Sequence, residues 1–135
     1  MKLHRFGKRG QAILELALSI TVLLLLALGA VQFGTLYSLK LRLEQAAREG
    51  ARFAAAHVIE NRDPDIIQHT RDASGELASD IEVQIATPEQ RADDKPVEIT
   101  VTYAYTPTVP LVKDILPLQG GKFLLRARAV MRIEG

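Results

Sequence analysis

The sequence contains no cysteine, so a thiol nucleophile and a disulfide framework are both excluded. Aromatic residues are also few. Glycine-rich phosphate loops and Ser-His-acid sets in a recognisable context are missing as well. The folded part of the chain must therefore be held together by packing or by its neighbours, and the composition neither requires nor excludes an oxidising compartment. We predict that the chain is not an enzyme, and that it has no cofactor and no small-molecule substrate.

Acidic residues are absent from the first ten positions, which carry four bases, Lys2, Arg5, Lys8 and Arg9. The remainder has 13 basic and 16 acidic residues, so the formal net charge of +1 hides a positional asymmetry. Such an asymmetry is typical of membrane proteins. No basic stripe with interleaved aromatic residues occurs, which argues against a nucleic-acid partner.

Charged residues are also absent from residues 16–39, a run of 24 positions. About 20 apolar residues in a helix cross the roughly 30 Å hydrocarbon core of a bilayer. We therefore predict a transmembrane helix over about residues 12–39. The basic residues ahead of it outnumber Lys40 and Arg42 behind it, which predicts a cytoplasmic N-terminus and an extracytoplasmic C-terminal part. The predicted location is the cytoplasmic (inner) membrane, crossed once.

Two other interpretations of the apolar run stay open. A secretory signal also follows a basic region, but its apolar core is usually about 7–15 residues long. Here the helical pattern continues without an obvious break after the small residues Ala27, Gly29 and Ala30, which argues against a cleavage signal there. A buried helix of a soluble protein would show a charged face, and none is present over this run.

The helical pattern continues beyond the membrane run. Apolar and small residues recur at three- and four-residue steps from Leu39 to Val58, which predicts one helix over residues 11–57. Within it, Ala46, Gly50 and Ala54 form a ladder that lets another backbone approach closely. That backbone could belong to a partner or to the chain's own domain. The predicted organisation is a leader (1–10), the long helix (11–57) and an extracytoplasmic domain (58–135).

The C-terminal part reads as a small α+β domain. Asp63-Pro64 is typical of a helix start, and we predict a second helix from there to about Ser79. Apolar residues then alternate with polar ones over Ile81–Ile85, Val97–Tyr105 and Leu125–Ile133, which predicts a three-stranded antiparallel sheet. Residues 106–118 combine three prolines with many apolar residues, so this loop either folds back over the sheet or meets a partner.

A metal site is conceivable where His57 and His69 flank Glu60, Asp63 and Asp65. Surface histidines near acids are far commoner than metal ligands, so we predict no metal.

Glu15 is the one residue that this organisation does not explain. A carboxylate at the centre of a membrane helix costs about 2.5–3.5 kcal/mol and less near its edge, and such acids usually have a function. Here a basic leader, Gly10, and then a glutamate at the fifth position of an apolar helix follow the arrangement of type IV prepilins. Together with residues 45–52, Gln-Ala-Ala-Arg-Glu-Gly-Ala-Arg, the chain resembles the TadE-like minor pilins of the tight-adherence (Flp) pilus machinery. Tail segments 101–107 and 127–131 resemble that family too.

The resemblance implies that a prepilin peptidase cuts between Gly10 and Gln11 on the cytoplasmic side. The mature chain would then be a minor pilin or pseudopilin that takes part in pilus assembly, with other pilins and the assembly platform as partners. It would enter the filament or stay at its base, and Glu15 would set the register between subunits. A membrane-anchored binding module that is never processed remains the alternative, and a secreted domain the third possibility.

Overall fold

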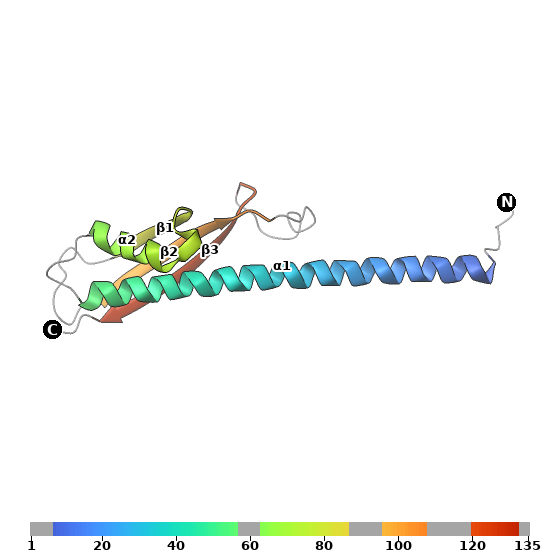
Figure 1. Ribbon diagram of the computed structural model, residues 1–135, viewed down its shortest axis with the longest axis horizontal. Helices are drawn as coiled ribbons and strands as arrows, with labels where there is room; N and C mark the ends of the chain where they lie inside the picture. Colours follow the sequence, from blue (N-terminus) through green and yellow to red (C-terminus); the bar gives the residue numbers. More distant parts are fainter. Residues whose placement is uncertain (1–6, 57–62, 87–95, 108–119, 133–135) are drawn as a thin grey trace. The chain divides into compact units, whose positions relative to one another are not determined.

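The computed structural model describes residues 7–56, 63–86, 96–107 and 120–132 (Figure 1). Its elements are the helices α1 (Lys8–Ala56) and α2 (Asp63–Ala73), the short 3-10 helix η1 (Gly75–Leu77), and the strands β1 (Ile81–Ala86), β2 (Pro96–Tyr105) and β3 (Phe123–Arg132). This confirms the predicted α+β fold. The chain divides into two units, Met1–Ser38 and Leu39–Gly135, and the second unit takes in the α1 residues from Leu39 onward.

The first unit contains the apolar part of α1. Among the described residues, α1 is the one helix long and apolar enough to cross a membrane, and its most apolar 18-residue window has a mean hydropathy of 2.4 and is 0% buried. A core helix of a soluble protein would bury such side chains, so this interpretation is disfavoured. Thr21 and Thr35 donate their hydroxyl protons to the carbonyl oxygens of Ala17 and Val31, which satisfies both hydroxyls inside the helix.

The sheet has the order β1-β2-β3, with both neighbouring pairs antiparallel, as predicted. The registers place Ile85 opposite Ile99 and Ile99 opposite Ala129, so the apolar positions of the three strands share one face. Gly120 and Gly121 precede β3 with φ of 60° and 79°, a left-handed conformation that glycine adopts without steric cost.

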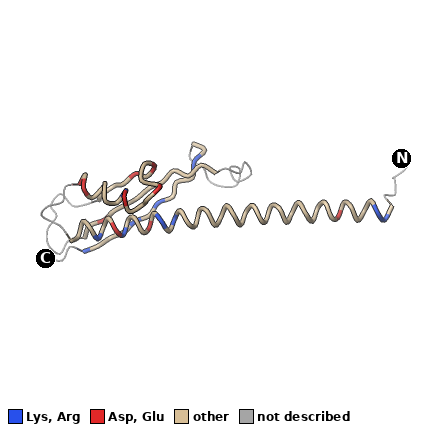
Figure 2. The backbone as a smooth tube through the Cα atoms, in the orientation of Figure 1, with Lys and Arg blue, Asp and Glu red and all other residues tan. Residues whose placement is uncertain are grey.

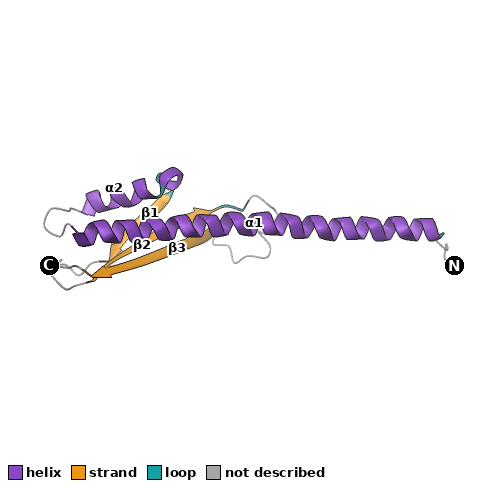
Figure 3. Cartoon of the chain, turned by 60° about the horizontal axis from the view of Figure 1, so that its bottom comes forward, coloured by secondary structure: helices purple, strands orange, loops and turns teal. Residues whose placement is uncertain are grey.

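One face of the sheet is covered by the second part of α1 and by α2, which lie alongside the strands in both views (Figures 1 and 3). Leu43, Ile66 and Ile99 are among the largest fully buried side chains. The buried residues of α1 are mostly small, which lets the helix lie close to its neighbours: Leu43, Ala46, Ala47, Gly50, Ala51 and Ala54. The core of the second unit is therefore a helix layer on a single sheet.

Several predicted boundaries were wrong or fall outside the described residues. Helix α1 begins at Lys8 rather than Gln11, and α2 ends at Ala73 rather than near Ser79. The second error arises because Gly75 has φ of 64°, which an α-helix cannot contain, so the chain turns into η1 there. His57, Val58, Ile133 and positions 108–118 of the apolar loop lie outside the described residues.

Candidate functional site

The predicted cleavage position lies in the first turn of α1. The backbone N–H groups of Gly10 and Gln11 both point to the carbonyl oxygen of Gly7, at 2.7 and 3.2 Å. No acidic residue stands in this turn, and Lys8 and Arg9 place positive charge at the positive end of the helix dipole. This turn is therefore weakly held, which favours its unwinding to an extended backbone.

Glu15 lies one turn after Gln11, on the same helix face, because side chains four residues apart are neighbours. It is exposed, and the adjacent side chains of Leu14 and Leu16 are 69% and 61% exposed. The described part of the chain contains no ion pair to Glu15. Its carboxylate directly precedes the charge-free run, where a bilayer offers little solvation.

The small-residue ladder is buried inside the second unit. Ala46, Gly50 and Ala54 are inaccessible to solvent. A Cβ atom on Gly50 would lie 2.1 Å from the Thr70 Oγ1 of α2 and 3.2 Å from the Ile99 Cδ1 of β2. The Thr70 hydroxyl is fixed by donating to the Ile66 carbonyl oxygen at 2.7 Å. At Gly50 the ladder is thus met by side chains of the chain's own domain, not by those of a partner.

Charged and aromatic residues line the contact between α1 and α2. Glu49 pairs with Arg52 at 2.7 Å and lies 3.7 Å from His69 Nε2, and the His69 ring stacks on Phe53 with centroids 4.1 Å apart. The hydrogen bond from Arg52 lowers the pKa of the Glu49 carboxyl below its ordinary value, partly opposed by desolvation. No cluster of three His, Cys, Asp or Glu side chains suited to a metal ion occurs among the described residues. Of the pair weighed as ligands, His69 instead packs on α1, and His57 lies outside the described residues.

Lys40 joins α1 to the sheet. Its ammonium group donates to the carbonyl oxygen of Arg126 on β3 and lies 3.6 Å from Glu44 Oε1. Farther along the unit, Arg42 and Glu76 of η1 are 3.6 Å apart. Sequence reasoning missed the contacts of Lys40 with Arg126 and of Arg42 with Glu76, because no local pattern pairs residues so far apart; Lys40 and Arg126 are separated by 86 positions.

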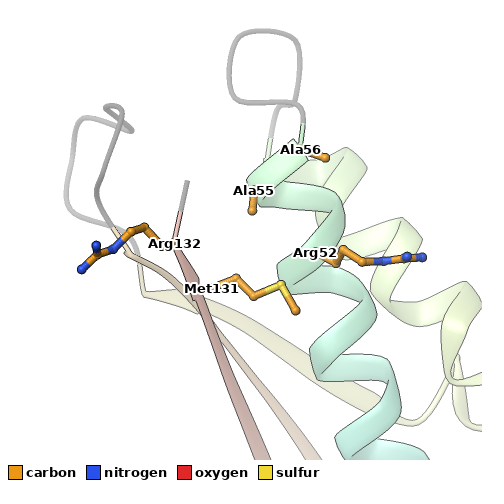
Figure 4. A pocket seen from close by; sticks show the side chains of 5 residues that line it. All are labelled: Arg52, Ala55, Ala56, Met131 and Arg132. Carbon is orange, nitrogen blue, oxygen red and sulfur yellow. The ribbon is translucent and has the colours of Figure 1, made fainter. Parts of the chain in front are cut away.

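A pocket lies where α1 ends beside the end of β3 (Figure 4). It is lined by Arg52, Ala55, Ala56, Met131 and Arg132, and the Met131 side chain extends toward the helix in the close-up. The lining residues that the structure describes offer apolar surface and two guanidinium groups, and none of them is a nucleophile or a general base.

Residues 10–52 match the family described as TadE-like protein. Over these residues the chain is similar to that family. The matched segment begins at the predicted cleavage position and includes Glu15, the whole charge-free run, and Ala46 and Gly50 of the ladder. It covers about a third of the 135 residues, while α2 and the sheet lie outside it. No curated protein and no solved structure matches the chain.

The match confirms the resemblance predicted from the sequence over residues 10–52, whereas the resemblance of segments 101–107 and 127–131 lies outside it and stays a prediction. The matched segment includes the apolar part of α1, the candidate membrane-spanning helix.

Proposed function

We propose that the chain is a minor pilin or pseudopilin of a tight-adherence (Flp) pilus, cut by a prepilin peptidase between Gly10 and Gln11. The observation that carries the proposal is the Glu15 carboxylate, which has no ion pair in the described part of the chain and lies one turn after Gln11 in the TadE-like segment. The weakly held first turn of α1 supports the cleavage position, because a peptidase needs an extended backbone.

Cleavage would give Glu15 a partner. An α-amino group has a pKa of about 7.7–8.0, so the new terminus on Gln11 is largely protonated at neutral pH. It lies one helical turn from Glu15 in the same subunit, and in an assembly it can equally meet the Glu15 of a neighbour. The desolvation of both charges offsets much of their attraction, so the pair fixes the axial register between helices more than it stabilises them. The partners in this scheme are other pilins and the assembly platform.

Two other possible functions require a mature chain with a different N-terminal residue. A membrane-anchored binding module would keep Met1, and a secreted domain would begin near Val31 after signal cleavage. The N-terminal residue of the protein recovered from its native host separates the three possibilities, because the pilin scheme requires Gln11. A chain that begins with Met1 or near Val31 would contradict the proposed function.

Gly10→Arg should abolish processing, because glycine presents no side chain to the peptidase and arginine adds a long charged one. The measurement is the size and N-terminal sequence of the chain from cells that contain the peptidase. Gly7→Arg is the matched control, since it makes the same change three residues earlier, where a Cβ atom meets nothing within 4 Å, and it should leave cleavage intact. A Gly10→Arg product shortened by ten residues would show that the assigned position is wrong.

A second experiment tests the orientation. Because the basic leader holds the N-terminus in the cytoplasm, alkaline phosphatase fused after Gly135 should be active. A reporter that fluoresces only in the cytoplasm should be dark at the same position. The opposite pair of readings would reverse the proposed topology.

A further inference from the structure

The second unit carries opposite charge on its two sides. The segment from α2 to β1 has a single arginine, Arg71, and six exposed acids: Asp63, Asp65, Asp72, Glu76, Asp80 and Glu82. These six acids are called the acidic side. The segment 120–132, which ends in β3, has no acid and four exposed bases: Lys122, Arg126, Arg128 and Arg132. These bases are called the basic side. Figure 2 shows the acidic residues gathered along α2 and basic residues along β3.

The sheet order keeps these two sides apart. Since β2 lies between β1 and β3, Glu82 of the acidic side and Arg126 of the basic side stand on opposite edge strands of the described sheet. In one cross-strand row Glu82 lies opposite Thr102, which in turn lies opposite Arg126. The backbones of Glu82 and Arg126 are thus two strand spacings apart, roughly 10 Å, and no ion pair joins the two side chains. Both charges are therefore available to another copy.

Neutralisation inside the unit is partial. Arg42 of α1 pairs with Glu76, and Arg128 pairs with Glu98 of β2. The Arg126 side chain has no ion pair among the described residues, and neither do the carboxylates of Asp80 and Glu82. Exposed charges of one sign on one edge repel each other, and an oppositely charged neighbour relieves this repulsion.

We propose that the acidic side of one copy docks against the basic side of a second copy of this chain. Because the two surfaces differ, the contact is heterologous, and each copy keeps a free acidic side and a free basic side for the next neighbour. Complementary charge sets the register and the partner of such a contact more than its affinity. The inference rests on the proposed function in one respect, since assembly of the membrane helices is what brings copies together.

The cysteine-free sequence allows a direct test by crosslinking. Gln84→Cys on β1 and Val130→Cys on β3 introduce single thiols at exposed, uncharged positions on the two sides. Full-length chains with different tags are produced together in membranes and treated with a short thiol-reactive crosslinker. The mixed pair should crosslink, whereas either variant alone should give little product, because a heterologous contact does not bring equivalent positions together.

Charge reversal then tests the cause. Lys122→Glu together with Arg126→Glu in the Val130→Cys chain should lower the mixed product about tenfold, because like charges are now apposed. Adding Asp80→Lys and Glu82→Lys to the Gln84→Cys chain should restore it. Arg48→Glu makes the same change as Arg126→Glu but on the exposed surface of α1, and it should leave the yield unchanged.

Each contrary result has one meaning. A mixed yield no greater than that of the equivalent positions, or a yield that ignores charge reversal, would overturn the docking proposal. Processing after Gly10 is read from the same samples. Intact crosslinks on chains that are never cut would contradict the proposed function alone, whereas normal processing without crosslinks would contradict the docking alone.

Discussion

Gly50→Ala should destabilise the second unit, residues 39–135, although alanine favours a helix more than glycine does. The new Cβ atom would lie 2.1 Å from Thr70 Oγ1, a separation that real Cβ atoms essentially never show, and 3.1 Å from Thr70 Cβ, which is also tight. Thr70 is fully buried and its hydroxyl donates a hydrogen bond to the Ile66 carbonyl oxygen, so the side chain has little room to move. Overpacking of this kind costs about 1–3 kcal/mol, and the gain in helix propensity offsets up to about 1 kcal/mol. A lower midpoint of thermal or urea unfolding of the full chain in detergent would show the loss.

Two variants show whether the contact with Thr70 is the cause. Gly34→Ala, in the same helix, places its Cβ atom in open space and should not lower stability. Thr70→Ala removes the nearest atom, so the double variant with Gly50→Ala should be more stable than the sum of the two single changes allows. This explanation would be contradicted if the stability losses of Gly50→Ala and Thr70→Ala simply added in the double variant, or if Gly34→Ala lost as much stability as Gly50→Ala.

Glu15→Val should insert into the membrane at least as well as the parent chain and still be cut after Gly10, yet it should abolish pilus formation. Insertion improves because a carboxylate near the bilayer is replaced by an apolar side chain. Assembly fails because the amino terminus of a neighbouring subunit loses the counter-charge that fixes its axial position. Crosslinking to other pilins in membranes, together with a count of surface pili, measures the effect.

Glu15→Asp is the matched control, because it keeps the charge and shortens the side chain by one methylene. It should retain a substantial part of the crosslinking and of the piliation that Glu15→Val loses. Normal pili and undiminished crosslinks in the Glu15→Val strain would remove the main physical support for the pilin mechanism.

The parts of the fold that follow local periodicity could be predicted from the sequence. Alternation over Val97–Tyr105 predicts a strand because successive side chains point to opposite faces, and the structure confirms it. The end of α2 could not be predicted in this way. Leu77 continues the apolar pattern and is buried as a core residue should be, but the chain reaches it through the left-handed Gly75. Apolar spacing does not reveal the backbone conformation of a glycine.

Contacts between distant segments could not be predicted either. The sequence shows that Ala46, Gly50 and Ala54 share one helix face, but it does not say what lies against that face. At Gly50 the neighbouring residue is Thr70, twenty positions later on another helix, and only the packed structure brings the two together. The proposed role of Glu15, by contrast, follows from the sequence, because a charge beside a long apolar run is poorly solvated in a bilayer.

The bond from Lys40 to the Arg126 carbonyl has a consequence for solubility. An edge strand displays unpaired backbone groups, and another extended chain can add to them and begin aggregation. Lys40 occupies one carbonyl of β3 with a charged group, and Arg126, Arg128 and Arg132 on the exposed face of this strand would lose solvation if another strand were added beside them. Backbone pairing of another strand with this edge is thus disfavoured, while contact through charged side chains remains possible. Copies that assemble at high local density can therefore touch without joining their sheets into one.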